Sequence, residues 1–257
     1  MAKCSAVVTG ASSGVGLAAS RALASRGCDL VIAARDAARL SSVAGELSSK
    51  FNVRVRAVQA DLTREDDVRR LISAAYSEFE DINVVFMSYG NPRCEPCEPL
   101  DASWDDLVDA FKMYVASSML IMGGVASRNR SRATVILTSS FSSRAPMWPT
   151  GVSDVIRASL PALAKLVSRR YPEKLRVLVL ELGSFRTPGA ERLIGRLAEA
   201  EGLQAERYWQ EKVASLSPLR RLGSEEELEE LISWLAFSPD YLTGAVIEFD
   251  GASTPCV

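Results

Sequence analysis

A glycine-rich turn close to the amino terminus constrains the fold of this chain more than any other stretch. The segment VVTGASSGVG joins a short β-branched run at 5–9 to a helical pattern at 14–26. Gly10, Gly14 and Gly16 let the backbone turn tightly at this junction, because glycine adopts conformations that side chains disfavour. A strand, a tight turn and a helix in this order predict the opening of a βαβ unit.

The rest of the chain repeats the same alternation with short connections. The pattern predicts strands at 5–9, 29–34, 53–58, 83–88, 133–139, 175–181 and 245–249. Helices are expected at 14–26, between the second and third strands up to about residue 50, from Thr63 to 80, from Ser103 to 127, at 153–170 and from Ser224 to 237. Strands that are apolar on both faces are typical of a parallel sheet covered on both sides. We therefore expect one α/β domain over residues 1–257, a doubly wound parallel sheet (Rossmann fold) of about seven strands with helices on both faces.

Two segments depart from this regular alternation. Residues 186–216 are helical and charged and lie between two core elements, so they form either a lid over a substrate pocket or a peripheral helical pair. We favour the lid, because ligands in such sheets bind beyond the carboxyl ends of the strands. Pro161 falls inside the helix expected at 153–170, which either kinks beside Arg157 or tolerates the proline.

The charge and the cysteines exclude several classes of function. A net charge of -2 disfavours nucleic acid and acidic membranes as partners, and no apolar run suggests a membrane span. The first ten residues lack the apolar segment of a signal peptide, so we expect a cytoplasmic protein. We expect no metal site, because the chain has no His and only Cys94 and Cys97 lie close together among its five cysteines. That pair is a redox pair, half a metal site or, as we favour, two loop cysteines, while Cys4, Cys28 and Cys256 are scattered.

The glycine turn also predicts a ligand. A turn of this kind lets the backbone approach a pyrophosphate, and the start of the following helix supplies N–H donors and a positive dipole. The strand, turn and helix context makes the motif far more specific than its glycines alone.

At this point the chain resembles a known family. TGASSGVG is similar to the TGxxxGxG motif of short-chain dehydrogenases/reductases, and the resemblance continues through ADLTRED and LGSFRT to PLRRLGSEEELEELISWLAFSPDYLTGAVIEFDGA. The LGSFRT segment departs from the family in having Leu182 in place of proline. The resemblance implies nicotinamide-nucleotide binding by Gly10, Ser12, Ser13, Gly14, Val15, Gly16, Arg35, Asp61, Leu62, Gly90, Arg157 and Thr187.

The type of nucleotide follows from the end of the second strand. NAD enzymes place an acid there, on the ribose hydroxyls. Ala34 occupies that position here, and Arg35 follows it, where a guanidinium could pair with a 2′-phosphate. We therefore favour NADP, with NAD as the alternative that the neighbouring Asp36 keeps open.

The catalytic positions of the family match only in part. Ser140 keeps the serine that ends the fifth strand, and Gly90 keeps the glycine of the motif on the fourth. The family's helix Asn falls on Phe111, while Ser153 and Arg157 stand where the resemblance leads us to expect Tyr and Lys. A serine hydroxyl is far less acidic than a phenol, and an arginine stays cationic, so these replacements preserve binding better than proton transfer.

Other groups could take over the proton. Tyr89 ends the fourth strand and Tyr114 follows on the helix, and a water held by Ser140 and Ser153 is a third possibility. We expect an oxidoreductase with Ser140, Ser153, Arg157 and Tyr89 at its catalytic site. A non-catalytic dinucleotide-binding protein, a sensor or an assembly subunit, is the alternative.

The partners are expected to be a small molecule and further copies of the chain. The segment APMWP predicts an apolar or bulky substrate, a carbonyl compound or an alcohol, unless it is just a stiff loop. Family members commonly pair through the helices expected here at 103–127 and 153–170, which predicts a homodimer or homotetramer.

Overall fold

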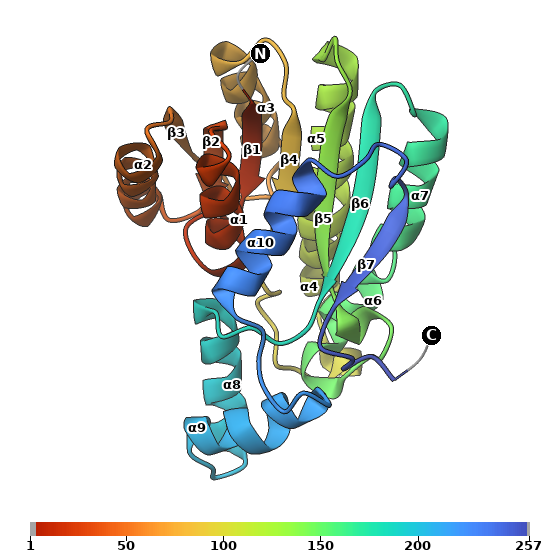
Figure 1. Cartoon of the computed structure of the whole chain (residues 1–257). Helices are drawn as coiled ribbons and strands as arrows, with labels where there is room; N and C mark the ends of the chain where they lie inside the picture. The colour runs from red at the N-terminus through yellow and green to blue at the C-terminus, as the bar shows by residue number, and fades with distance from the viewer. Residues whose placement is uncertain (1–3, 256–257) are drawn as a thin grey trace.

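A single parallel sheet organises the protein, and the computed structural model describes residues 4–255 of it. Within these residues seven strands follow the order β3-β2-β1-β4-β5-β6-β7, as Figure 1 shows. Their bounds are β1 Ser5–Thr9, β2 Asp29–Ala34, β3 Val55–Gln59, β4 Val84–Met87, β5 Ala133–Ser140, β6 Leu175–Leu182 and β7 Ala245–Phe249. The predicted doubly wound α/β fold is confirmed.

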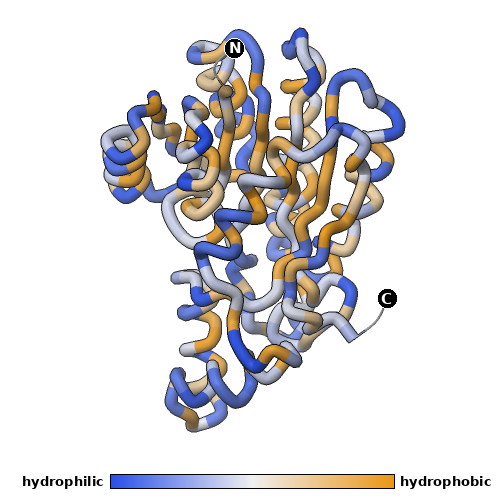
Figure 2. Tube along the Cα trace, in the orientation of Figure 1, coloured by the Kyte–Doolittle hydropathy of each residue, from blue (hydrophilic) through white to orange (hydrophobic). Residues whose placement is uncertain are grey.

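Helices cover both faces of the sheet. Helices α1 (Gly14–Ser25), α2 (Ala37–Phe51) and α10 (Glu225–Ala236) pack on one face, and α3 (Glu65–Glu78), α5 (Ser117–Arg128) and α7 (Leu160–Arg170) on the other. The remaining helices are α4 (Trp104–Phe111), α6 (Gly151–Arg157), α8 (Pro188–Ala200) and α9 (Ala205–Tyr208). Strands β1, β2, β4 and β6 are buried along their whole length, and Figure 2 shows hydrophobic residues concentrated in the sheet. This burial explains why these strands read as continuous apolar runs.

The helix starts agree with two of the three expected caps. The side chains of Ser103 and Ser224 accept backbone hydrogen bonds in capping boxes at the starts of α4 and α10. The prediction for Thr63 was wrong: helix α3 starts at Glu65, and the Thr63 hydroxyl donates to Asp61. A short polar side chain can satisfy a turn as readily as a helix end, and the sequence alone does not separate the two.

The long helix expected at 103–127 contains a π-helical turn at Lys112–Ala116, between α4 and α5. Together these segments span Trp104–Arg128, which is long and apolar enough to cross a bilayer, contrary to our expectation from the sequence. Half of its most apolar window is buried inside the fold, as in a helix that belongs to a protein core, so the segment is weak evidence for a membrane span.

The helix expected at 153–170 is broken. Helix α6 ends at Arg157, and α7 starts at Leu160 with Pro161 in its first turn. Proline is well accommodated there, because the first turn of a helix has no partner for that N–H. Both readings of Pro161 hold in part, because the helix is interrupted directly after Arg157 and the proline is accommodated in the first turn of α7.

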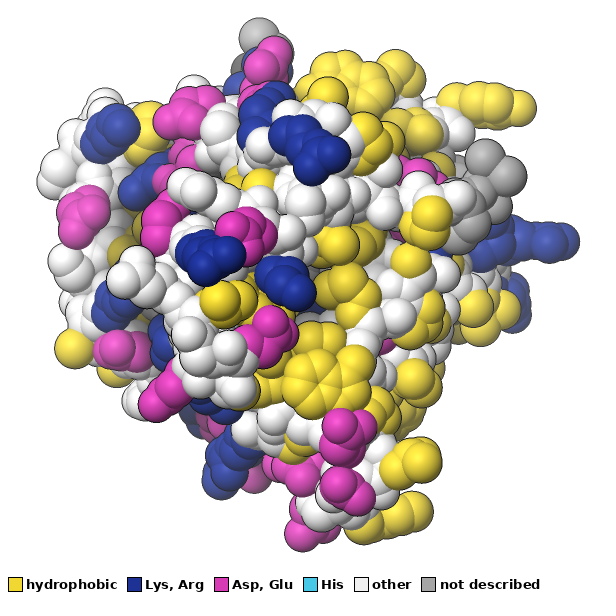
Figure 3. Space-filling model, turned by 90° about the horizontal axis from the view of Figure 1, so that it is seen from below, with side chains coloured by type: hydrophobic (Ala, Val, Ile, Leu, Met, Phe, Trp, Pro, Cys, Tyr) yellow, Lys and Arg dark blue, Asp and Glu magenta, His cyan; other side chains and the backbone are white. Residues whose placement is uncertain are grey.

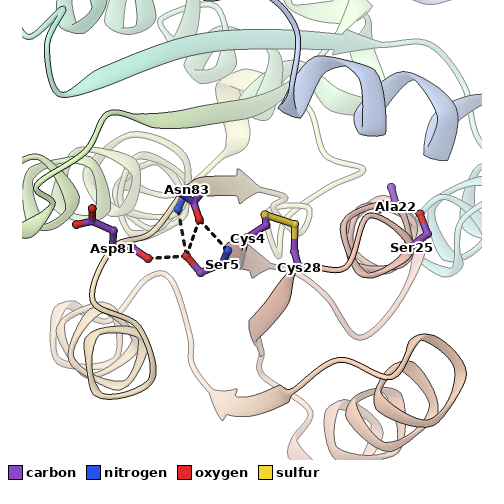
Figure 4. The surroundings of a disulfide bond; sticks show 7 residues. All are labelled: Cys4, Ser5, Ala22, Ser25, Cys28, Asp81 and Asn83. Carbon is purple, nitrogen blue, oxygen red and sulfur yellow. Dashed lines mark hydrogen bonds between the residues drawn. A yellow bond between two sulfur atoms is a disulfide. The ribbon is translucent and has the colours of Figure 1, made fainter. Parts of the chain in front are cut away.

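Two cysteines treated as scattered in the sequence form a disulfide. Figure 4 shows Cys4 bonded to Cys28, with Cα atoms 4.3 Å apart. Because Ser5 on β1 pairs with Asp29 on β2, the two preceding cysteines face each other at the amino ends of these strands. The third scattered cysteine, Cys256, lies outside the described residues.

The segment expected at 186–216 forms a helical extension. It contains α8, α9, a π-helical turn at Trp209–Val213 and a short turn at Ala214–Leu216. Figure 1 shows α8 and α9 beyond the carboxyl ends of the strands, and they enclose a small apolar cluster of their own.

Candidate functional site

A cavity of about 950 Å³ lies at the carboxyl ends of the strands. Figure 3 views the molecule from this end, where hydrophobic and basic side chains lie next to one another across the middle of the face. The cavity brings together thirteen of the residues predicted from the sequence, namely Gly10, Ser12, Ser13, Gly14, Val15, Arg35, Asp61, Leu62, Tyr89, Gly90, Ser140, Arg157 and Thr187. Gly16 and Ser153 are predicted site residues that do not line it.

The glycine turn is packed so closely that side chains would not fit. Gly10 has a φ of +62°, and a Cβ atom there would lie 2.9 Å from the carbonyl oxygen of Ser88. A Cβ on Gly16 would lie 2.3 Å from the carbonyl oxygen of Gly10. Gly16 thus acts behind the cavity wall, where it allows helix α1 to begin directly against β1.

The start of α1 is open toward the cavity. Within the described chain, no side chain caps its first turn, although Ser13 occupies the N-cap position. The backbone N–H groups of this turn are therefore available to an anion, together with the positive end of the helix dipole. Thr187 closes the other side, since a Cβ on Gly14 would lie 2.9 Å from that of Thr187.

The end of β2 carries exposed arginines. Arg35 and Arg39 both line the cavity, and Nη2 of Arg35 lies 3.6 Å from the position of a Cβ on Gly90. The neighbouring carboxylate is occupied, because Oδ1 of Asp36 accepts the backbone N–H of Arg39 at 3.0 Å and caps helix α2. Two arginines and one capping aspartate therefore line the cavity beside this strand end.

Asp61 and Leu62 line the cavity at the end of β3. The carboxylate of Asp61 accepts hydrogen bonds from the backbone N–H and the hydroxyl of Thr63, at 3.0 and 2.8 Å. The backbone N–H of Asp61 donates to Asp67 at 2.9 Å, which fixes the course of this loop.

Arg157 and Tyr114 form a pair in the cavity wall. Nη2 of Arg157 donates to the hydroxyl of Tyr114 at 3.1 Å, and that hydroxyl donates to the carbonyl of Gly90 at 2.7 Å. Burial acts to lower the pKa of Arg157, but the attraction of Tyr114 and of nearby carboxylates raises it overall. The guanidinium therefore remains a fixed cation beside a phenol.

Ser153 faces the protein interior. It is fully buried, and its hydroxyl donates to the carbonyl of Thr150 at 3.0 Å. Its backbone N–H donates to Oε1 of Glu95 at 2.7 Å. Burial raises the pKa of the Glu95 carboxyl, and Oε2 of this side chain has no hydrogen-bond partner within residues 4–255. The structure thus places a carboxyl group behind the position where the resemblance predicts a tyrosine.

Of the other aromatic residues considered, one forms a hydrogen bond within the cavity wall and one lies outside the cavity. The Ser118 hydroxyl donates to the carbonyl of Tyr114 at 2.6 Å, so the 2.6 Å contact between Tyr89 and Ser118 is donated by Tyr89. Burial raises the pKa of Tyr89 above its ordinary value. Phe111, where the family's helix Asn was counted, is 51% exposed and does not line the cavity.

The far part of the cavity is formed by loops and by the helical extension. Met147 and Pro149 line it, whereas Trp148 of the same segment does not and is 50% exposed. Helix α8 and the turns after it contribute Leu193, Ile194, Leu197, Tyr208, Trp209, Val213 and Leu216. Nη2 of Arg196 donates to the carbonyl of Glu95, which links α8 to the loop opposite. Cys94 and Cys97 in that loop are free thiols that do not line the cavity, and burial raises the pKa of Cys94 to about 12.

Reasoning from the sequence missed Glu95, Ser142 and Asp154, which lie behind the cavity wall. Asp154 directly follows Ser153 and is fully buried, so a carboxylate at the start of the helix predicted at 153–170 was the available signal.

The chain is similar to known oxidoreductases in sequence and in fold. A family model described as enoyl-(acyl carrier protein) reductase matches residues 10–254. The chain is 29% identical over 262 residues to cis-4-hydroxycyclohexanecarboxylate dehydrogenase of Sinomonas cyclohexanicum, covering 97% of this chain and 96% of that protein. It is 28% identical over 254 residues to an uncharacterized oxidoreductase of Mycobacterium tuberculosis, covering 97% and 91%.

Among solved structures, the fold is similar to L-sorbose reductase of Gluconobacter frateurii in complex with NADPH and L-sorbose. The TM-score is 0.91 at 24% identity, over 99% of this chain and 98% of that chain. Actinorhodin polyketide ketoreductase with NADPH gives a TM-score of 0.90 at 16% identity, over 99% and 98%.

Proposed function

The chain belongs to the short-chain dehydrogenase/reductase family, whose model matches residues 10–254, and we propose that it is an NADP-dependent oxidoreductase. The reaction is hydride transfer between the nicotinamide and a carbonyl compound or alcohol. One observation carries this proposal: a single cavity joins the glycine turn and Arg35 at one end to Ser140 and Arg157 at the other.

The residues present fit a dinucleotide phosphate. Gly10, Ser12, Ser13, Gly14 and Val15 would hold the pyrophosphate at the start of α1, with Gly16 behind them. Asp61 and Leu62 would contact the adenine, Gly90 and Arg157 the nicotinamide ribose, and Thr187 the carboxamide. Arg35 would pair with the 2′-phosphate, and the engagement of Asp36 in capping favours NADP over NAD. Bound nicotinamide supplies the hydride chemistry.

An apolar or bulky substrate suits the rest of the cavity. Apolar side chains of α8 and the following turns line this part together with Met147 and Pro149, and the charged side chains of Arg192, Arg196 and Lys212 line it beside them. We propose that residues 186–216 act as a lid, which Arg196 holds against the loop at Glu95. Opening of this contact would admit the substrate.

We also propose a homodimer or homotetramer. Large hydrophobic side chains are exposed on the helices expected to pair, with Trp104 at 79%, Phe111 at 51%, Val155 at 70% and Leu166 at 65%. Where such side chains join into one contiguous apolar patch, the patch marks an interface between proteins. The cytoplasmic location and the absence of nucleic-acid partners remain predictions.

The alternative is a dinucleotide-binding protein without catalysis. The burial of Ser153 away from the cavity favours it, because the position expected to carry the proton-transferring phenol does not reach the ligand. General acid–base catalysis contributes roughly 10²- to 10⁴-fold, so its loss would slow the reaction without abolishing hydride transfer.

One experiment separates the two functions. NADPH and NADH are titrated by fluorescence, and then ketones, aldehydes and alcohols are screened by the absorbance of the reduced nucleotide. Saturable binding of NADPH with turnover of part of the panel supports the oxidoreductase. Tight NADPH binding without turnover of any compound would favour the non-catalytic protein, and failure to bind either nucleotide would contradict both.

A further inference from the structure

Ser140 in the cavity wall is connected through Ser142 to a buried carboxylate. Oγ of Ser142 lies 2.8 Å from Oγ of Ser140 and 2.5 Å from Oδ1 of Asp154. Ser140 is partly exposed and lines the cavity, while Ser142 is 2% exposed and Asp154 is fully buried. The three side chains form an unbroken hydrogen-bonded line from the cavity to an acid in the interior.

This line is held in place from both ends. The backbone N–H of Ser142 donates to Oγ of Ser140 at 3.3 Å, within the tight turn that follows β5. Oδ2 of Asp154 accepts the backbone N–H of Met147 at 3.1 Å and the hydroxyl of Thr150 at 2.9 Å. The geometry therefore exists before a substrate binds, as preorganised catalytic groups require.

The other candidates for proton transfer are poorly suited. The hydroxyl of Tyr114 donates to the carbonyl of Gly90, and that of Tyr89 to Ser118. Burial raises the pKa of both phenols, which makes them weaker acids. Ser153 does not reach the cavity, and a guanidinium such as Arg157 does not release its proton.

We propose that Ser140, Ser142 and Asp154 form a proton relay between the substrate oxygen and the protein interior. The proposal rests on the proposed oxidoreductase function and names the route of its proton. Ser140 contacts the reacting oxygen, whereas Ser142 and Asp154 act through it.

In alcohol oxidation the relay carries one proton inward. The substrate O–H bond breaks and its proton goes to Oγ of Ser140, whose own proton moves to Oγ of Ser142. The proton of Ser142 moves to Oδ1 of Asp154. The hydride leaves the substrate carbon with its electron pair for the nicotinamide, so that the alcohol becomes a carbonyl. After the product leaves, the proton returns along the same line to water in the cavity.

Reduction uses the opposite arrangement of the same hydrogen atoms. Each serine carries a single hydroxyl hydrogen, so the line points inward when Asp154 is a carboxylate and outward when Asp154 carries a proton.

The test compares Asp154→Asn and Ser142→Ala with Ser143→Ala. Ser143 is a matched control, because it lies in the same turn and is buried but bonds to Glu181 outside the relay. For each protein the melting temperature, the NADPH dissociation constant and the kcat for alcohol oxidation are measured. We expect Asp154→Asn and Ser142→Ala to lose about 10²-fold in kcat with little change in NADPH affinity. Ser143→Ala should keep the kcat and the NADPH affinity of the wild type, even if loss of its bond to Glu181 lowers the melting temperature.

A second measurement does not depend on turnover. Proton NMR of the unliganded protein should show a downfield hydroxyl resonance from the short bond between Ser142 and Asp154. We expect this resonance in wild type and in Ser143→Ala but not in Ser142→Ala. Ser142→Ala therefore still tests the relay if Asp154→Asn fails to fold. A folded Ser142→Ala variant with wild-type kcat overturns the relay but leaves the proposed function intact. Wild-type protein that binds NADPH and turns over no substrate overturns the proposed function and the relay with it.

Discussion

The guanidinium of Arg157 lies against the phenol of Tyr114. Nη2 is 3.1 Å from the hydroxyl oxygen, and Cζ is 5.1 Å from the centre of the ring. Burial raises the pKa of Tyr114 above its ordinary value of 10.0, and the attraction of Arg157 acts in the opposite direction. The cation thus does two things, since it faces the ligand cavity and stabilises a buried phenol.

Replacing Arg157 by Met should weaken both effects. We expect the NADPH dissociation constant to rise about tenfold, because a hydrogen bond to a charged group contributes about 1.5–3 kcal/mol. The pKa of Tyr114 should rise further in the same variant. Fluorescence titration and the ultraviolet absorbance of phenolate measure the two changes. Arg157→Lys keeps the charge and should lose less affinity; equal loss in both variants would contradict the role assigned to the charge.

Gly16→Ala should destabilise the protein and abolish NADPH binding. The added Cβ would meet the carbonyl oxygen of Gly10 at 2.3 Å, and overpacking of this kind costs about 1–3 kcal/mol. Gly45→Ala is the matched control, because Gly45 is exposed on α2 with nothing within 4 Å of its Cβ position. That change should stabilise by about 0.5–1 kcal/mol. Urea denaturation of both variants checks the opposite signs.

Arg35→Ala should change the preference between nucleotides. Loss of a charge-assisted bond to the 2′-phosphate should raise the NADPH dissociation constant at least about tenfold, while NADH binding stays constant. Arg69→Ala removes another exposed arginine, one that pairs with Glu65 on α3, and should change neither constant. Parallel loss of NADPH and NADH affinity in Arg35→Ala would count against a 2′-phosphate contact.

Glu181→Gln should stabilise the protein at neutral pH and above. Burial raises the pKa of the Glu181 carboxyl above its ordinary value of 4.5. The folded state then holds this proton more tightly than the unfolded state, so wild-type stability falls as pH rises through 4.5 and the raised pKa. The glutamine has no such proton. Thermal melts across this range should show an advantage for the variant that vanishes below 4.5, and an advantage independent of pH would refute the explanation.

The disulfide should contribute to stability without affecting the ligand. Converting Cys4 and Cys28 to Ser opens a loop with a sequence separation of 24, for which chain entropy predicts a loss of about 3–4 kcal/mol. Cys94→Ser, which removes a free thiol, should have little effect on unfolding by urea. We expect the double variant to keep the NADPH affinity of the wild type at temperatures where it remains folded.

Local patterns were sufficient to predict the fold and the residues that gather in the cavity around the glycine turn. The geometry of the glycine turn depends largely on residues close together in the sequence. Gly10 has a positive φ, and the Cβ position of Gly16 lies against the carbonyl oxygen of Gly10. The apolar strands likewise predict a covered parallel sheet without knowledge of their neighbours.

The reaction end depends on contacts between distant segments, which the sequence did not reveal. The resemblance places the family's helix Asn on Phe111, but the residue that contacts Arg157 is Tyr114, in a π-helical turn. The approach of Ser142 to Asp154 depends on how the turn after β5 packs against α6. The partner of Cys4 likewise depends on the register of β1 against β2.

The disulfide closes a covalent ring of residues 4–28 that contains strand β1 and helix α1. Its covalent closure lies at the amino ends of β1 and β2, whereas the glycine turn lies at the carboxyl end of β1. The disulfide and the proposed nucleotide-binding turn therefore lie at opposite poles of one small ring. A reducing environment would lower the heat tolerance of this half of the protein while leaving its selectivity among nucleotides unaltered.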